Sequence, residues 1–206
     1  MSKKNDSPIQ VKVVLLGETG VGKTSIISRF INNSFEEEVI STKGANFSSK
    51  TIIFKECENK SVQFDLWDTA GQEQYRSLTM IFYKDAKIAI LVYDITRKET
   101  FEEIKKYWYK QIKENSTPDI IIAVVANKCD LLDNEKVSEE EGKEFANQIG
   151  AIFKSTSCSE NIGIEELFKD IGTKFLNTNF SDDTSETNKN IIIGEGVDAK
   201  KKKKCC

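Results

Sequence analysis

A glycine-rich stretch near the start of the chain carries the residue types that hold phosphate groups. Residues 17–24 read GETGVGKT, which matches the pattern G-x-x-x-x-G-K-[ST], and they lie between an apolar run and a helical pattern. The glycines let backbone N–H groups turn inward around phosphates, and the helix N-terminus adds partial positive charge. A chance glycine-rich turn is the alternative, but the preceding strand and the following helix argue against it.

The polar residues of this stretch have distinct expected roles. The Lys23 ammonium would reach the β- and γ-phosphates of a nucleotide and act in catalysis, and the Thr24 hydroxyl would ligate Mg²⁺. The residues expected to contact the nucleotide here are Thr19, Gly20, Val21, Gly22, Lys23, Thr24 and Ser25.

A second stretch, WDTAGQE at residues 67–73, follows an alternating apolar run. Asp68, at the end of that predicted strand, is placed to hold Mg²⁺ through water. Gly71 would let its N–H approach a γ-phosphate closely, and Gln72 is the candidate for orienting an attacking water. Taken alone, an exposed turn explains this stretch equally well, but the phosphate-binding pattern before it favours the chemical interpretation.

A third stretch, NKCD at residues 127–130, points to the base of the nucleotide. The Asp130 carboxylate can accept hydrogen bonds from both the ring N–H and the exocyclic amine of guanine, whereas adenine has no such donor pair on that edge. A site built around such bonds discriminates strongly, because the wrong base leaves buried groups unpaired. As a bare tetrapeptide it is weak, but after a strand we expect Asn127, Lys128 and Asp130 to bind the nucleotide.

The elements that must position these stretches alternate between strands and helices. Helical apolar stripes run through residues 26–31, 101–112 and 164–175, and a Ser138–Glu141 capping box starts a further helix that Gly150 ends. This order predicts an α/β fold of the P-loop NTPase class, with a mostly parallel six-stranded sheet and helices on both faces. The predicted strands cover residues 10–16, 51–54, 61–67, 87–94, 120–126 and 152–155.

Length and composition favour one domain over residues 10–176, after a short flexible segment at 1–9 and before a flexible polar tail at 177–206. The net charge is −3, and the five lysines at 200–204 carry +5, so the rest of the chain carries −8. An acidic domain argues against nucleic acid as a partner.

The five cysteines have no metal-ligand spacing, which favours a reduced intracellular protein. No apolar run reaches the ~20 residues that span a bilayer, and Ser2 excludes N-myristoylation.

With these motifs in place, the chain resembles the Ras superfamily of small GTPases over residues 11–175. The resemblance implies that Thr42 binds Mg²⁺ and senses the γ-phosphate, so that Thr24, Thr42 and Asp68 form the metal site. It implies that Phe35 packs edge-on against guanine. The motif that usually reads Ser-Ala-Lys is Ser157-Cys158-Ser159 here. The resemblance implies that Ser157 and Cys158 bind the nucleotide, with the Cys158 N–H at the guanine oxygen, while the lysine is missing.

Within the superfamily the chain looks most like the Rab branch, with the early-endosomal Rabs favoured by GANF at residues 44–47. That likeness implies geranylgeranyl chains on Cys205 and Cys206 beside the lysine run. Lys43 departs from the isoleucine that Rabs usually carry. An effector-reading aromatic cluster is expected at Phe47, Trp67 and Phe82.

The function implied is a membrane-anchored switch in vesicle traffic that binds GTP or GDP with Mg²⁺ and hydrolyses GTP slowly, since no arginine is evident in cis. Implied partners are an exchange factor, a GTPase-activating protein, a GDP dissociation inhibitor or escort protein, and effectors. The implied location is the cytoplasmic face of an intracellular membrane, in exchange with the cytosol, with endosomes favoured. A GTP-loaded scaffold with little hydrolysis is the alternative, and NKCD disfavours an ATPase or kinase.

Overall fold

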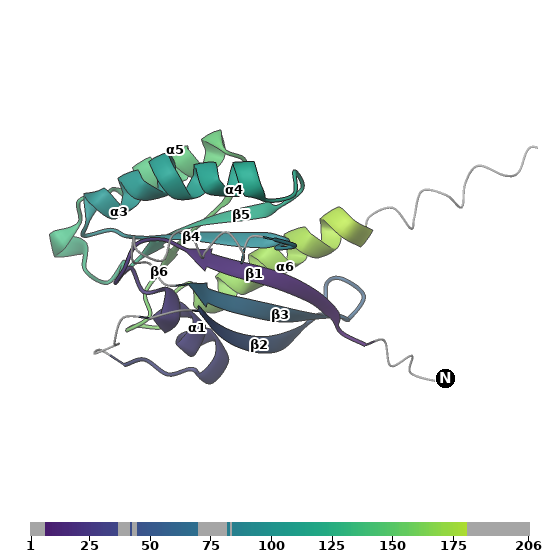
Figure 1. Cartoon of the computed structure of the whole chain (residues 1–206). Coiled ribbons are helices and arrows are strands. Elements are labelled where there is room, and N and C mark those ends of the chain that lie inside the picture. Colours follow the sequence, from purple (N-terminus) through teal and green to yellow (C-terminus); the bar gives the residue numbers. More distant parts are fainter. Residues whose placement is uncertain (1–6, 37–41, 43–44, 70–81, 83, 181–206) are drawn as a thin grey trace, which may run out of the picture.

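The computed structural model of the protein describes residues 7–36, 42, 45–69, 82 and 84–180, and a six-stranded sheet forms its centre (Figure 1). The strands lie in the order β2-β3-β1-β4-β5-β6, and the β2–β3 pair alone is antiparallel. The predicted α/β class is therefore confirmed. The strands are β1 (Ile9–Leu16), β2 (Ala45–Phe54), β3 (Lys60–Thr69), β4 (Ile88–Asp94), β5 (Ile121–Asn127) and β6 (Ile152–Thr156).

Helices cover both faces of this sheet (Figure 1). One face carries α1 and α6, and the other carries the run from α3 to α4 together with α5. Strands β4 and β5 are buried at every residue, as expected for parallel strands covered on both sides. The helical segments are α1 (Lys23–Asn32), α3 (Lys98–Glu103), η2 (Ile104–Trp108), α4 (Tyr109–Asn115), η3 (Leu132–Asn134), α5 (Glu139–Gln148) and α6 (Ile164–Phe180).

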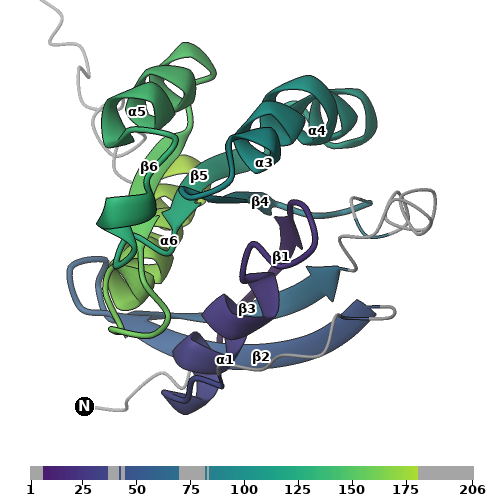
Figure 2. The same ribbon diagram turned by 90° about the vertical axis from the view of Figure 1, so that its left-hand side faces the viewer.

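The loops that follow β1, β5 and β6 leave the same edge of the sheet, which faces the viewer in Figure 2. Parallel strands bring their carboxyl ends together, and helices that start there point their N-termini at the space beyond the edge. The register aligns the last residues of β4, β5 and β6: Asp94 lies opposite Asn127, and Asn127 lies opposite Thr156. The first and third motifs of the sequence and the segment after β6 therefore meet at one place.

The edge strand β2 is longer than the sequence predicts. We expected only residues 51–54, but β2 begins at Ala45, opposite Thr69, and pairs with β3 as far as Phe54, opposite Lys60. Its first half reads ANFSSK, which lacks the run of β-branched residues that identifies a strand. The ladder with β3 supplies the backbone hydrogen bonds, so a mostly polar segment is held as a strand without an apolar face of its own.

Aromatic rings fill the core beneath α1 and α6. Phe30 of α1 stacks on Phe168 of α6 with ring centroids 3.6 Å apart, and Phe64 of β3 meets Phe168 edge-on at 5.7 Å. All three rings are buried. Such packing fixes α1 against the sheet, and α1 in turn fixes the glycine-rich loop at its N-terminus.

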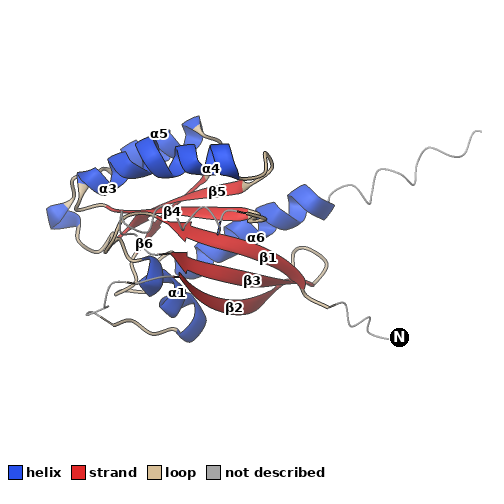
Figure 3. Ribbon diagram, in the orientation of Figure 1, coloured by secondary structure: helices blue, strands red, loops and turns tan. Residues whose placement is uncertain are grey.

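The helix predicted over residues 101–112 is built from α3, η2 and α4 in succession (Figure 3). Its predicted apolar face is confirmed, since Phe101, Ile104, Trp108 and Ile112 are all buried. The middle segment is a turn of π-helix, a feature that often accompanies functional sites. The Trp108 indole Nε1 donates to Glu18 Oε1 of the glycine-rich loop at 3.1 Å, so this turn reaches the edge of the sheet.

Helix α5 starts as the sequence predicts, whereas α6 ends later than predicted. The predicted capping box of α5 is present, with Ser138 and Glu141 bonded reciprocally. Helix α6 ends at Phe180, four residues beyond the predicted domain boundary at residue 176. The Thr178 hydroxyl donates to the carbonyl four residues earlier, and Lys60 lies over the Phe180 ring at 4.7 Å, so side chains stabilise this extra turn. Within the described residues, no helix is long and apolar enough to cross a bilayer.

A glycine in α6 provides a test of this packing. Gly→Ala in a helix ordinarily stabilises by ~1 kcal/mol, but a Cβ at Gly172 would collide with the Phe54 ring and lie 2.9 Å from Phe64 Cζ. Overpacking of this kind costs about 1–3 kcal/mol. We therefore expect Gly172→Ala to lower the urea midpoint of unfolding, whereas the exposed Asn177→Ala in the same helix should leave it unchanged or raise it. A higher midpoint for Gly172→Ala would contradict the packing described.

Candidate active site

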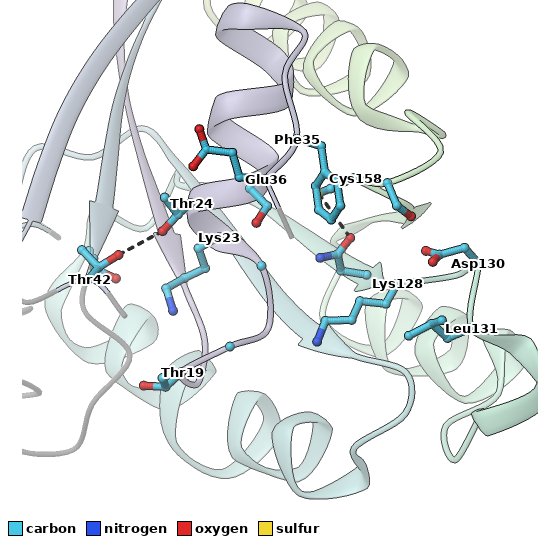
Figure 4. A pocket seen from close by; sticks show the side chains of 16 residues that line it. Thr19, Lys23, Thr24, Phe35, Glu36, Thr42, Lys128, Asp130, Leu131 and Cys158 are labelled. Atoms are coloured by element: carbon cyan, nitrogen blue, oxygen red, sulfur yellow. Dashed lines mark hydrogen bonds between the residues drawn. The ribbon is translucent and has the colours of Figure 1, made fainter. Parts of the chain in front are cut away.

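A cavity of about 510 Å³ opens at the carboxyl edge of the sheet (Figure 4). Its walls come from the loop between β1 and α1, the segment after α1, and the loops after β5 and β6. The predicted site residues that line it are Thr19, Gly20, Gly22, Lys23, Thr24, Ser25, Phe35, Thr42, Asn127, Lys128, Asp130 and Cys158. The sequence analysis missed four further lining residues, which are Glu36, Thr69, Leu131 and Ser159.

Two predicted contact residues, Val21 and Ser157, do not line the cavity. The Val21 side chain is fully buried in the core, and its carbonyl accepts a hydrogen bond from the Asn127 side chain at 2.7 Å. Ser157 is also fully buried, and its hydroxyl lies 2.9 Å from that of Ser159 and accepts from the N–H of Glu160 at 3.1 Å. Neither side chain faces a ligand, so any contact from these residues is through the main chain.

The loop between β1 and α1 has a shape that two glycines make possible. Gly22, the residue before α1, has a φ of 100°, and a Cβ there would collide with the side-chain amide of Asn127. Gly17, at the start of the loop, has a φ of 144°, and a Cβ there would collide with the carbonyl of Val92. The loop therefore lies tightly against the sheet and leaves the first turn of α1, with its unpaired N–H groups, facing the cavity.

Lys23 is the buried cation of this loop. Its side chain is only 6% exposed, and Nζ donates to the carbonyls of Gly17 at 2.7 Å and Glu18 at 3.0 Å. Burial lowers the pKa of Lys23 to about 8, although the carboxylates of Asp68 and Glu18 oppose this shift. A phosphate beside Nζ would favour the charged form, so the ammonium is placed to neutralise a phosphate.

Three side-chain groups beside Lys23 form a set suited to Mg²⁺. Asp68 Oδ2 accepts from the hydroxyl of Thr24 at 2.7 Å and from that of Thr42 at 3.4 Å, and the two hydroxyls are 3.0 Å apart. Burial raises the pKa of Asp68, and its Oδ1 is buried without a hydrogen-bond partner among the described residues. Hard oxygen ligands are those that Mg²⁺ prefers, and an ion here would satisfy the orphaned oxygen, so the residues fit the metal.

The other end of the cavity is organised around Asn127, which is 2% exposed. Its Nδ2 donates to the carbonyl of Val21 in the glycine-rich loop at 2.7 Å. Its Oδ1 accepts from the hydroxyl of Thr156 at 2.9 Å, and the Cys158 thiol lies 3.7 Å away. One amide therefore joins the loops after β1, β5 and β6, a role that the tetrapeptide NKCD alone does not reveal.

The remaining residues around this end differ in exposure. Figure 4 shows Phe35, Cys158, Asp130 and Leu131 on the side of the cavity away from Thr42. Phe35 and Leu131 are 39% and 41% exposed, and Asp130 is exposed as well, so an apolar ring and a carboxylate are both open to a ligand. A planar base carrying N–H donors would match this combination.

Asp94, at the end of β4, connects the loop after β4 with the loop after β5, and it was not identified from the sequence. The Lys128 ammonium lies 2.6 Å from its Oδ2, and Arg97 Nε lies 3.2 Å from the same atom. Asp94 is 1% exposed; burial alone would raise its pKa, but hydrogen bonds from Lys128 and Thr96 hold the pKa below its usual value. The signal in the sequence was a carboxylate ending an otherwise apolar strand.

Arg97 lies beside the phosphate loop and was not identified from the sequence, which led only to the expectation that no arginine acts in cis. Its Nη2 donates to the carbonyl of Thr19 at 3.0 Å while Nε pairs with Asp94. Because both ends of the guanidinium are engaged with protein groups, Arg97 holds the loop in place. The link spans 78 residues of sequence, which is why the motif itself does not contain it.

The predicted aromatic cluster is present and joins Phe47 of β2, Trp67 of β3 and Phe82. The Phe47 and Trp67 ring centroids are 5.3 Å apart, and those of Trp67 and Phe82 are 5.4 Å apart. Phe47 is 55% exposed, so the rings are accessible to a partner, and their role in effector binding stays a prediction. Four further predicted residues lie outside the described part of the chain, and they are Gly71, Gln72, Cys205 and Cys206.

Comparison with known proteins finds similarity to the Ras family along nearly the whole described chain. The model of the Ras family matches residues 12–177. The chain is 43% identical to human "Ras-related protein Rab-22A", over 82% of this chain and 85% of that protein. It is 44% identical to mouse "Ras-related protein Rab-31", over 79% and 81%. It is 36% identical to "Ras-related protein Rab11C" of Nicotiana tabacum, over 95% and 92%.

The Asn127 network yields a prediction about ligand retention. In Asn127→Asp, a carboxylate faces the Val21 carbonyl, so an attractive hydrogen bond becomes a repulsive contact in a buried place. Breaking such a bond and leaving its partner unsatisfied costs about 1–3 kcal/mol, so release of bound nucleotide should be about 5- to 150-fold faster. A fluorescent nucleotide chase measures the rate. The same exchange at Asn115, on α4 and away from the cavity, should have no effect; equal rates for all three proteins would contradict the network's role.

Proposed function

We propose a function from one premise, which is that this chain belongs to the Ras family and, within it, to the Rab small GTPases. As such it binds GTP and GDP with Mg²⁺, hydrolyses GTP, and works as a switch in membrane traffic with an exchange factor, an activating protein, a GDP dissociation inhibitor and effectors as partners. One observation carries the assignment of residues below: a buried lysine, a hydroxyl–carboxylate set and an open carboxylate surround a single cavity.

At the phosphate end, we assign Lys23 to the β- and γ-phosphates, because its ammonium is buried among carbonyls that a phosphate can outcompete. The N–H groups of the glycine-rich loop and of the first turn of α1 supply further donors. Thr24 and Thr42 would hold Mg²⁺ directly and Asp68 through water. When bound, the metal supplies positive charge to the phosphate oxygens during transfer.

For hydrolysis, we assign Gln72 to orient the attacking water and Gly71 to approach the γ-phosphate with its N–H. Phosphoryl transfer of this kind depends on positioning and on charge stabilisation more than on covalent chemistry. The guanidinium of Arg97 donates from Nε to Asp94 and from Nη2 to the Thr19 carbonyl, so these donors are already engaged with protein groups and we assign Arg97 no part in the transfer. A slow intrinsic rate that an activating partner accelerates follows from this arrangement.

The switch follows from where Thr42 lies. Its hydroxyl reaches Thr24 and Asp68 from a segment that is remote in sequence, and a bound metal and γ-phosphate would add further support at this position. Loss of the γ-phosphate on hydrolysis would remove that support and release the segment. The exposed ring of Phe47 lies five residues further along the chain and packs with the half-buried rings of Trp67 and Phe82, and an effector that contacts this cluster would read the change.

Anchoring is assigned to the far end of the chain. Geranylgeranyl chains on Cys205 and Cys206, beside the lysines of residues 200–204, would supply two lipids and a basic patch, and stable attachment takes at least two such signals. Each lysine near an anionic surface adds ~1 kcal/mol. The protein associates with intracellular membranes, and among these we propose endosomes, on the likeness to Rab-22A and Rab-31.

The base assignment is tested by Asp130→Asn. An amide cannot accept both donors of guanine, but its N–H can pair with the 2-oxo group of xanthine. Losing charge-assisted bonds of 1.5–3 kcal/mol each should weaken GDP binding by roughly a hundredfold or more and favour xanthosine diphosphate. Competition against a fluorescent nucleotide gives both affinities. Asp133→Asn, on the exposed η3 turn nearby, is the matched control, and unchanged GDP affinity in Asp130→Asn would refute the base contact.

A further inference from the structure

Arg29, in the last turn of α1, connects that helix to the loop after β6. Its Nε donates to the carbonyl of Cys158 at 2.8 Å and its Nη2 to the carbonyl of Ser159 at 3.2 Å. Its Nη1 donates to the carbonyl of Asn33, just past the end of α1, at 2.9 Å. One guanidinium therefore holds three main-chain carbonyls, two of which lie about 130 residues away in sequence.

The loop that Arg29 holds forms the wall of the cavity at its base end. Cys158 and Ser159 both line the cavity, and Cys158 is buried. Inside the loop, the bonds run between Ser157 and its neighbours Ser159, Glu160 and Ile162, so they fix its shape. Arg29 instead joins the loop to α1, and so, together with the Asn127 amide on the other side, it sets where residue 158 stands relative to a ligand.

The same guanidinium contacts the other wall of the base end. Its carbon lies 5.9 Å from the ring centroid of Phe35, within the range of a cation–π contact. Phe35 is 39% exposed and lines the cavity. Beside this contact, Asn161 of the loop donates to the Asn33 side chain at 3.2 Å, which strengthens the same junction. A single side chain thus supports both the ring and the loop between which a base would lie.

We propose that Arg29 is a positioning residue for guanine recognition: it holds the loop so that the main chain at Cys158 meets the 6-oxo group of the base, and it supports the Phe35 ring. The inference rests on the proposed function, since it requires a guanine in this cavity. Arg29 itself lines no part of the cavity, so it acts through the other two residues.

An arginine suits this task better than a lysine would. Its planar fork presents several N–H donors in fixed directions, so it can bind consecutive carbonyls at once, whereas a lysine offers a single flexible ammonium. Bonds from a charged donor are stronger than neutral ones. Arg29→Lys should therefore keep the charge and part of the contact to one carbonyl, while Arg29→Ala removes both.

The test compares three diphosphates that share ribose and phosphates but differ in the base. GDP and IDP both carry the 6-oxo group, and 2-aminopurine riboside diphosphate lacks it. Affinities are measured by competition on full-length protein with Mg²⁺, for the wild type, Arg29→Ala, Arg29→Lys and Lys169→Ala. Lys169 lies on the surface of α6 in a pair with Glu165, so its variant removes one positive charge far from the base.

In Arg29→Ala we expect GDP and IDP to bind about tenfold more weakly, as for a lost charge-assisted bond. The 2-aminopurine nucleotide should weaken by at most about threefold, through the Phe35 support that any purine uses. Arg29→Lys should fall between wild type and Arg29→Ala, and Lys169→Ala should match the wild type.

An equal loss for all three nucleotides would overturn the proposal, because a general structural role would not depend on the 6-oxo group; so would no loss at all. If Arg29→Ala does not fold, the ratio of GDP to 2-aminopurine affinity in Arg29→Lys decides the question in the same way. Failure of the proposed function is separate, since it would appear in the wild type as no preference for GDP over ADP.

Discussion

The buried amide of Asn127 is the interaction on which the cavity depends. It donates to the glycine-rich loop at Val21 and accepts from Thr156 in the strand that precedes the third loop. Gly22 must be a glycine because this amide occupies the space that a Cβ would take. In a buried place each of these groups would be left unsatisfied without its partner, so the three loops keep their relative positions as a unit.

The topology explains why so short a side chain can join three loops. Strands β4, β5 and β6 are parallel neighbours, and their register puts Asp94, Asn127 and Thr156 in one row at the carboxyl edge. On the other side of β1, β3 places Asp68 opposite Leu15, and the hydroxyl of Thr69 donates to the Leu15 carbonyl at 2.7 Å. The carboxylate that we assign to the metal and the loop that we assign to the base are thus set by the same sheet.

Much of this arrangement could be predicted from the sequence, because its parts are local. A few consecutive residues are enough to identify the GETGVGKT loop, the buried strands and the capping box of α5. The contacts that hold the parts together could not be predicted in the same way. Arg97 reaches Thr19 and Arg29 reaches Cys158 across 78 and 129 residues, and only the fold brings them together. The polar half of β2 was missed because its strand conformation comes from pairing with β3.

We propose that this edge of the sheet binds GTP specifically and hydrolyses it slowly. The most direct measurement is single-turnover phosphate release from the purified, GTP-loaded protein with Mg²⁺, beside an ATP control and Gln72→Leu. We expect slow release from GTP alone, which the substitution suppresses. Release from ATP at a similar rate, or tight GTP binding with no phosphate released by either protein, would contradict it.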